Sequence, residues 1–532
     1  MLFAAIATIY LIYLADYPGE PGEDKADTYR YTDDPPEEEV IEYVEPDPPT
    51  PIIFPPDQLN LENVLIMSKQ RRQIVHQPDM QRIYNWIEER EPTTLDATML
   101  FDSSRRHNLS REEAAEDVAV FFDLLRHIYA AYHYFGGDRV FLPIRNEVQE
   151  EINRREWWTD NQLFELIRSR LLHVIFDYHI RLNSYTGSVF VNPHNNFIWN
   201  TPFDRSEQGF SKRESGLYVS YVAGHDKDDL FRLIVNEAGE FYYAPIIFRP
   251  ASLGETYSLS MTFENGESET VNLTRTVHVR THAWGAANSI RFENGIPIVS
   301  IRRMGNPFNP YAHSRSEALG ALSLVEEVRD EPVFILDLRS NEGGTSAFSY
   351  MWLYRLLGEV PPANFNWLRF NDSIISAPLE LPRPARWYHG FREPAGLYFT
   401  YPADLFGHYI HMEPIAENIS FTSPQARDRV VSNEQIVIVL VDRFTMSSGE
   451  TFADQFTNIE NTLVIGQNTF GMLLTSGGAP LYLPNSGMPV GLGRHMLVHP
   501  EGTWQEGIGF APDVWVVGDA LTAALSLLNE LE

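Results

Sequence analysis

The chain contains no cysteine, and basic residues are scarce in it. The first absence excludes disulfide bonds, thiolate metal sites and a cysteine nucleophile, although it does not fix the redox compartment. The second leaves 41 Lys and Arg against 73 Asp and Glu, a formal net charge of −32. Because phosphate binding depends on Lys and Arg, and no basic stripe is present, we expect no nucleic-acid partner.

The N-terminal region lacks an apolar run long enough to span a membrane. The segment that follows also has few apolar residues with which to form a folded core. Residues 1–14 are almost entirely apolar, but a membrane-spanning helix needs roughly 20 residues. We therefore interpret residues 1–15 as an export signal whose true start is missing, or as a short membrane anchor. Residues 16–56 hold 13 acidic residues, 2 basic residues and 10 prolines, which predicts a disordered linker. Together they predict an extracytoplasmic protein (periplasmic, secreted or membrane-anchored), near a membrane through residues 1–14.

The pattern of residues 57–183 predicts an N-terminal helical domain. Ser110 and Glu113 form a capping-box pair ahead of an amphipathic stretch. Thr159 resembles the N-cap of a later helix, whose apolar residues recur at helical spacing as far as Ile175. We expect that helix to run into Asp177-Tyr178-His179.

The remaining chain divides into a β-rich module and an α/β core. Within residues 184–282, alternating residues at 257–263, a turn at 264–266 and a second run at 270–274 predict a hairpin. A degenerate PDZ-like domain is one interpretation of this module, although no Gly-φ-Gly-φ loop is evident. Residues 283–532 alternate strands with helices, which predicts an α/β core. The predicted elements are strands at 296–301, 333–338, 436–441 and 463–465, and helices at 314–329, after 344, after 447 and at about 519–531.

The most informative turn is Thr445-Met-Ser-Ser-Gly-Glu450, directly after the strand at 436–441. A serine at a strand-to-helix turn exposes its hydroxyl at a helix N-terminus, where the next N–H, from Ser448, can stabilise an oxyanion. Ser447 is therefore a candidate nucleophile. On this segment alone the simpler interpretation is an N-cap, because serine leads that position in helices generally.

Three other segments carry groups that a serine nucleophile needs. Residues 336–344 end a strand in Asp-x-Arg-x-Asn-x-Gly-Gly, whose glycines leave backbone N–H groups unshielded. His179 follows an aspartate, and Glu506 opens a glycine-rich turn into a strand. An acid that orients a base, and a base that activates a hydroxyl, is the logic of serine catalysis. Taken singly, each segment also has a bland interpretation, as a turn, a structural histidine or a solvated carboxylate.

Together the four segments resemble the C-terminal processing, or tail-specific, serine peptidases, over roughly residues 105–185 and 285–520. The resemblance implies a crotonase/ClpP-like α/β peptidase core. It places the nucleophile at Ser447, three residues before Glu450. It also implies an oxyanion hole made by the N–H of Ser448 and that of Gly343 or Gly344, with the choice between the two glycines open.

The chain departs from one branch of this family. The Ser-Lys branch has its lysine at the position of Met472, and a thioether cannot accept a proton. The tricorn-core-like branch uses a histidine of Asp-x-His and a glutamate about 60 residues after the serine. His179 and Glu506 match that pattern, with Glu506 lying 59 residues after Ser447 (506 − 447), but the serine that precedes the histidine in that branch is Tyr178 here.

The resemblance thus implies a Ser447–His179–Glu506 triad that hydrolyses peptide bonds in protein or peptide substrates without a cofactor. We expect His179 to titrate near neutrality, so that activity falls below about pH 6. One alternative is a catalytically inactive peptidase-fold binding or scaffold protein, which Met472 motivates. Another is a crotonase-like acyl-CoA enzyme, which lacks an activated serine. A metallopeptidase is disfavoured, because H-E-x-x-H is absent and the histidines show no ligand spacing.

Several questions stay open at this point. They are the identity and cleavage specificity of the substrate, the oligomeric state, and the role of the Pro- and aromatic-rich insertion near residues 361–430. That insertion would suit either a substrate groove or an oligomer contact.

Overall fold

The structure is a computed structural model. It describes residues 52–72, 100, 104–183, 194–250, 254–278, 280–283, 285–307, 314–361, 366–370, 412–416, 419–422, 430–476, 481–493, 495–498 and 506–529. The predictions for residues 1–15 and for almost all of the acidic linker lie outside these ranges. Among the described helices, none combines the length and the apolar character that crossing a bilayer requires.

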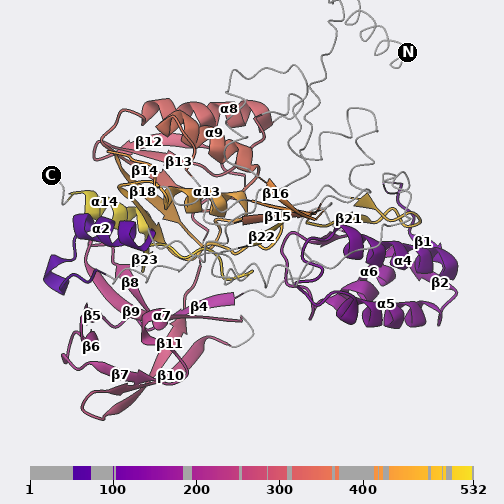
Figure 1. Cartoon of the computed structure of the whole chain (residues 1–532), viewed down its shortest axis with the longest axis horizontal. Helices are drawn as coiled ribbons and strands as arrows, with labels where there is room; N and C mark the ends of the chain where they lie inside the picture. The colour runs from indigo at the N-terminus through magenta and orange to yellow at the C-terminus, as the bar shows by residue number, and fades with distance from the viewer. Residues whose placement is uncertain are drawn as a thin grey trace, which may run out of the picture. The chain divides into compact units, whose positions relative to one another are not determined.

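A large mixed sheet forms the centre of the fold and confirms the α/β class (Figure 1). Its parallel strands are β13 (Ile296–Ser300), β14 (Val333–Asp337), β18 (Ile436–Val441), β19 (Thr462–Gly466) and β23 (Val514–Val516), in that spatial order. The antiparallel strand β12 (Ser289–Glu293) pairs with β13. The predicted strands in this region are confirmed to within one residue at each end. Because parallel strands end at one edge of a sheet, the turns after β14 and β18 are brought together there.

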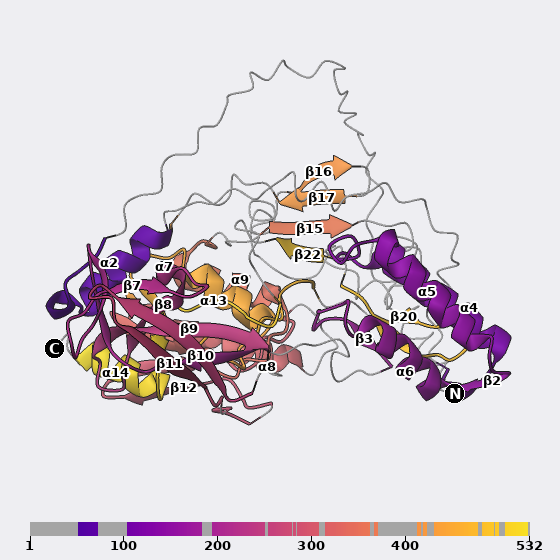
Figure 2. The same ribbon diagram turned by 90° about the horizontal axis from the view of Figure 1, so that it is seen from below.

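Helices cover both faces of this sheet (Figures 1 and 2). Successive side chains of a strand point to opposite faces. Val437 and Val439 of β18 accordingly pack in the core under α8 (Ser314–Ser323), α9 (Ser346–Leu357) and α13 (Ser448–Phe456). Ile438 and Leu440 lie in the opposite core, with α2 (Leu61–Arg72) and α14 (Ala520–Asn529). The alternation explains why the whole of β18 reads as apolar.

The β-rich region continues the same sheet. Strand β8 (Phe231–Val235) is parallel to β23, and the order then runs through β9 (Phe241–Pro250), β4 (His194–Ile198), β11 (Ser268–Arg275), β10 (Thr256–Phe263) and β7 (Val219–Val222). The hairpin β10–β11 is confirmed. A second hairpin, β5 (Phe203–Ser206) and β6 (Gly209–Lys212), and the short helix α7 (Lys227–Leu230) complete this region. A PDZ-like character, and the domain bounds as a whole, stay predictions.

The N-terminal helices are α4 (Arg111–Ile128), α5 (Asp138–Ile152) and α6 (Asp160–Leu171), with the short strands β1 (Asn108–Ser110) and β2 (Trp157–Thr159) paired beside them. The capping box of Ser110 and Glu113 and the Thr159 N-cap are both present. The prediction that α6 reaches Asp177 is wrong. The helix ends at Leu171, and beyond it the Val174 N–H donates to the carbonyl of Leu171, three residues back, which is the tighter spacing of a turn.

Late segments of the chain complete the hydrophobic core of these helices. Leu474, Leu483, Val490 and Met496 pack in one cluster with α4, α5 and α6. The associated strands are β3 (Arg181–Leu182), β20 (Leu481–Tyr482), β21 (Pro489–Gly491) and β22 (His495–Val498), with β15 (Asn366–Phe370), β16 (Met412–Ala416) and β17 (Ile419–Thr422) pairing next to β22. The chain around residues 471–474 therefore runs from the mixed sheet into the helical region.

Candidate active site

Ser447 occupies a strained turn between β18 and α13. Its backbone has φ 53° and ψ −124°, a conformation that a residue with a side chain adopts at a cost of about 1–3 kcal/mol. Such a turn is typical of a serine presented as a nucleophile at the end of a strand. The Ser447 N–H donates to Glu450 Oε2 at 2.8 Å, while Ser447 Oγ lies 3.0 Å from His179 Nε2. The structure thus brings together two candidates separated by 268 residues.

His179 lies in irregular backbone between α6 and β3, and it is 6% exposed. Its N–H donates to Asp177 Oδ1 at 2.8 Å. Asp177 Oδ2 accepts the hydroxyls of Tyr129 and Thr475, both at 2.7 Å, so a buried carboxylate ties the base to two other segments. When Ser447 donates its hydroxyl proton to Nε2, the imidazole proton resides on Nδ1. Among the residues described, Nδ1 is buried and has no hydrogen-bond partner.

Burial, followed by the positive charge of Arg181, lowers the pKa of His179 to about 3. The expectation of a near-neutral titration is therefore wrong for this closed site. A buried imidazole that is poorly solvated favours its neutral form, which is the form that accepts a proton. The low pKa keeps the His179 imidazole neutral throughout the physiological pH range.

Glu506 contacts the backbone beside His179 rather than the imidazole ring. Its Oε1 accepts the Tyr178 N–H at 2.8 Å, and its Oε2 accepts the N–H groups of Leu473 and Leu474 at 2.9 and 2.7 Å. Burial, followed by the nearby charge of Asp177, raises the pKa of Glu506 well above its ordinary value. Burial also raises the pKa of Asp177. Two carboxyl groups thus flank the Tyr178-His179 segment.

The predicted oxyanion turn lies against the nucleophile. A Cβ added to Gly343 would lie 2.9 Å from the Ser447 Cβ and 3.1 Å from the Ser448 N, so only glycine permits this approach. The Gly343 N–H donates to Asn341 Oδ1 at 2.7 Å, which occupies it. At Gly344 the carbonyl accepts the Ser448 hydroxyl at 3.0 Å, while its N–H has no hydrogen-bond acceptor within the described part of the chain. The N–H of Ser448, at the start of α13, is likewise open there.

A buried ion-pair cluster lies at the end of β14, directly before the turn that contains Gly343 and Gly344. Asp337, at the end of β14, accepts Arg302 and Arg339 at 2.7 and 2.9 Å. Arg302 also donates to the carbonyls of Asp337 and Arg339. These two guanidinium groups outweigh burial and lower the pKa of Asp337. The sequence motif identified Asp337 and Arg339, but it gave no signal for Arg302, which follows a different strand.

Glu450 is a further residue of the site whose contacts the sequence did not reveal. It is fully buried, and its carboxylate accepts four hydrogen bonds. The pattern Ser-x-x-Glu at residues 447–450 was the available signal, but it also fits an ordinary capping box. Met472 donates its backbone N–H to Glu450 Oε2 at 2.9 Å.

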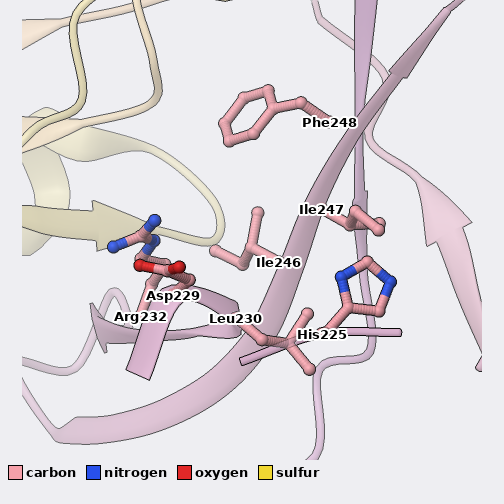
Figure 3. A pocket seen from close by; sticks show the side chains of 7 residues that line it. All are labelled: His225, Asp229, Leu230, Arg232, Ile246, Ile247 and Phe248. Atoms are coloured by element: carbon pink, nitrogen blue, oxygen red, sulfur yellow. The ribbon is translucent and has the colours of Figure 1, made fainter. Parts of the chain in front are cut away.

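A small pocket lies apart from these groups, on the β-rich region. It has a volume of about 190 Å³ and is lined by His225, Asp229, Leu230, Arg232, Ile246, Ile247 and Phe248 (Figure 3). Figure 3 shows Ile246 of β9 between Asp229 with Arg232 on one side and His225 with Ile247 on the other. None of the predicted catalytic residues contributes to it. Within the described ranges, no cluster of three or more His, Asp or Glu side chains is arranged to hold a metal ion.

The chain is similar in part to known proteins. Residues 296–516 match the model of peptidase family S41. Among solved structures, mature CPAF is 13% identical, with 79% of this chain and 95% of that chain covered at a TM-score of 0.38. The photosystem II D1 C-terminal processing protease is 14% identical, with 79% and 96% covered at 0.34. The tricorn protease is 12% identical, with 78% and 35% covered at 0.30. No curated protein sequence matches the chain.

Proposed function

Since this chain belongs to peptidase family S41 and is a serine-type peptidase, we propose that Ser447 is its nucleophile, His179 its general base and Glu506 the residue that orients the base. The substrates are proteins or peptides, and the reaction is hydrolysis of a peptide bond through an acyl-enzyme. The observation that carries this proposal is the 3.0 Å contact of Ser447 Oγ with His179 Nε2 at a strained strand-to-helix turn.

The mechanism follows from that contact. His179 Nε2 takes the hydroxyl proton as Ser447 Oγ attacks the peptide carbonyl, and the imidazolium then protonates the leaving amine. A water molecule next gives its proton to His179 and attacks the acyl-enzyme, and the returned proton regenerates Ser447. Because the imidazole is buried, its charged intermediate needs stabilisation, and we assign this role to the carboxyl groups of Asp177 and Glu506, which contact the backbone of residues 178 and 179 rather than the ring itself.

Gly344, rather than Gly343, is the better oxyanion donor in this proposal. The Gly343 N–H already donates to Asn341, whereas Gly344 and Ser448 keep their N–H groups open. Each such donor contributes roughly 3 kcal/mol to transition-state stabilisation in serine enzymes. The hydroxyl of Ser448, which donates to the carbonyl of Gly344, supports the same assignment by linking the two donor residues.

Glu506 would orient the base through the backbone. Its acceptance of the Tyr178 N–H fixes the peptide that precedes His179. This assignment places the chain with the Ser/His/Glu branch of the family, and Met472 supports it because a thioether cannot replace the lysine of the other branch.

The site of action is a further part of the proposal. The apolar residues 1–14 and the acidic, proline-rich segment that follows support export, with cleavage or retention at a membrane surface. An extracytoplasmic peptidase, in the periplasm or outside the cell, is the location they favour.

The proposal is tested by fluorophosphonate labelling with mass-spectrometric identification of the modified residue. We expect labelling at Ser447 in the wild-type protein and loss of labelling in His179→Ala, with Glu207→Gln, an exposed change, as the control. A folded wild-type protein that is not labelled at Ser447 would favour the inactive scaffold instead.

A further inference from the structure

Four successive backbone N–H groups, those of residues 471–474, donate to only two carboxylates. Gly471 and Met472 donate to Glu450 at 2.7 and 2.9 Å. The N–H groups of the next two residues donate to Glu506 at 2.9 and 2.7 Å. We call residues 471–474 the strap. Backbone that alternates strictly, as in a strand, sends successive N–H groups to opposite sides, so this convergence is specific to the site.

Each carboxylate that holds the strap also holds one member of the catalytic pair. Glu450 Oε2 accepts the Ser447 N–H at 2.8 Å. Glu506 Oε1 accepts the N–H of Tyr178, the residue before His179, at 2.8 Å. The strap is therefore the piece of backbone that connects the nucleophile to the base through two side chains.

Glu450 uses both of its oxygens for this purpose. Oε2 accepts Ser447 and Met472, while Oε1 accepts the Gly471 N–H and the Thr469 hydroxyl at 2.6 Å. An amide at this position keeps only one acceptor oxygen, and its NH₂ would face two donors. The four donors therefore require a carboxylate.

The local charges support the same conclusion. Within the described chain, no lysine or arginine forms an ion pair with Glu450. The nearby Arg443 instead donates to the carbonyls of Thr469, Gly507 and Ile508. A buried carboxylate without an ion-pair partner is costly, and hydrogen bonds from N–H and O–H groups are what offset that cost.

We propose that Glu450 is a positioning residue of the peptidase reaction, which together with Glu506 sets the distance between Ser447 Oγ and His179 Nε2 by clamping the strap. This inference rests on the proposed function of Ser447 and His179. It adds a role for the position where the other branch of the family carries its lysine. There the backbone N–H groups of residues 471–474, not the side chain of Met472, hold the two carboxylates in place.

The test measures the saturation kinetics of a fluorophosphonate on the full chain. We expect Glu450→Gln to lower the maximal inactivation rate about 10- to 100-fold, because a displaced reacting pair loses rate without losing affinity. The half-saturating probe concentration should change by less than about twofold, which separates alignment from binding. Glu207→Gln is the matched control, with the same substitution at an exposed glutamate.

A second pair of variants covers the case in which Glu450→Gln does not fold. Thr469→Val removes one donor to Glu450, whereas Thr469→Ser keeps the hydroxyl and its contacts. We expect the valine variant to inactivate more slowly and the serine variant to match the wild type. Equal rates for these two variants, or a wild-type rate in folded Glu450→Gln, would overturn the inference. Absence of Ser447 labelling in the wild type would instead overturn the proposed function itself.

Discussion

Ser447 and His179 meet at 3.0 Å, but the backbone on the two sides of that contact is fixed in different ways. The nucleophile side consists of turns that follow the adjacent parallel strands β14 and β18, so the sheet register places it. The base side, residues 175–180, contains no helix or strand and is held by the carboxyl groups of Asp177 and Glu506. Steric changes should therefore damage the nucleophile side, and changes of polarity or protonation should damage the base side.

The largest effect is expected at Gly344. An added Cβ would lie 1.9 Å from the carbonyl oxygen of Met304, and φ is +139°. We expect Gly344→Ala to lower kcat by about 10²- to 10³-fold through displacement of an oxyanion donor. Gly209→Ala is the control, since its φ is +115° but no atom lies within 4 Å of the added Cβ. A wild-type kcat in Gly344→Ala would remove this glycine from the oxyanion hole.

On the base side, the informative change is Asp177→Asn. The amide keeps one acceptor oxygen for a site that receives the His179 N–H and two hydroxyls. We expect kcat to fall by about 10- to 100-fold as His179 shifts, with a loss of about 1–3 kcal/mol in the free energy of unfolding. Asp229→Asn, on the exposed helix α7, is the matched control for both measurements. If kcat is unchanged while stability falls, Asp177 does not position the base.

The pH dependence separates the two sides further. His179 has a pKa of about 3 in the folded protein and about 6.5 when unfolded, so the unfolded chain binds the extra proton between those values. Its contribution to stability is complete above about pH 6.5 and is lost as the pH falls toward 3. We expect the acid limb of fluorophosphonate labelling to lie below about pH 5.

Thermal unfolding of the wild type and of His179→Asn measures the contribution of the His179 pKa shift to stability. The difference in Tm between the two should shrink steadily from pH 7 to pH 4, because only the wild type has a histidine that binds a proton on unfolding in this range, whereas the other titrating groups contribute to both proteins. A difference that does not vary with pH would contradict a depressed His179 pKa. His173→Asn, at an exposed position, provides the comparison for a histidine without such burial.

The smallest effect is expected at Met472. Its backbone N–H donates to Glu450, and truncation of the thioether leaves that hydrogen bond in place. We expect Met472→Ala to change kcat by less than about threefold. A larger loss of kcat, with Tm preserved, would show that the side chain takes part in the reaction.

Much of the nucleophile side could be predicted from the sequence. The apolar run at 436–441, the Ser-Ser-Gly-Glu turn and the Gly-Gly turn after β14 are local patterns, and each produces the expected element. The choice between Gly343 and Gly344 could not be made in advance, because it depends on which N–H the Asn341 side chain occupies.

The base side was less predictable, since its determinants are remote in the chain. The end of α6 at Leu171 depends on a turn that the continuing apolar pattern conceals. The depressed pKa of His179 arises from burial by segments far from it. Glu450 shows the remaining limit, because a capping-box glutamate and a buried four-donor clamp have the same spacing from the serine.

The separation of the catalytic pair along the chain has a consequence for biosynthesis. During translation, His179 is synthesised long before Ser447. The contact between the two side chains joins residues that are 268 positions apart in the chain. Glu506, which holds the backbone beside the base, follows 59 residues after the nucleophile (506 − 447). If these three residues act as proposed, the nascent polypeptide carries no assembled hydrolytic centre until nearly all of this sequence has been translated.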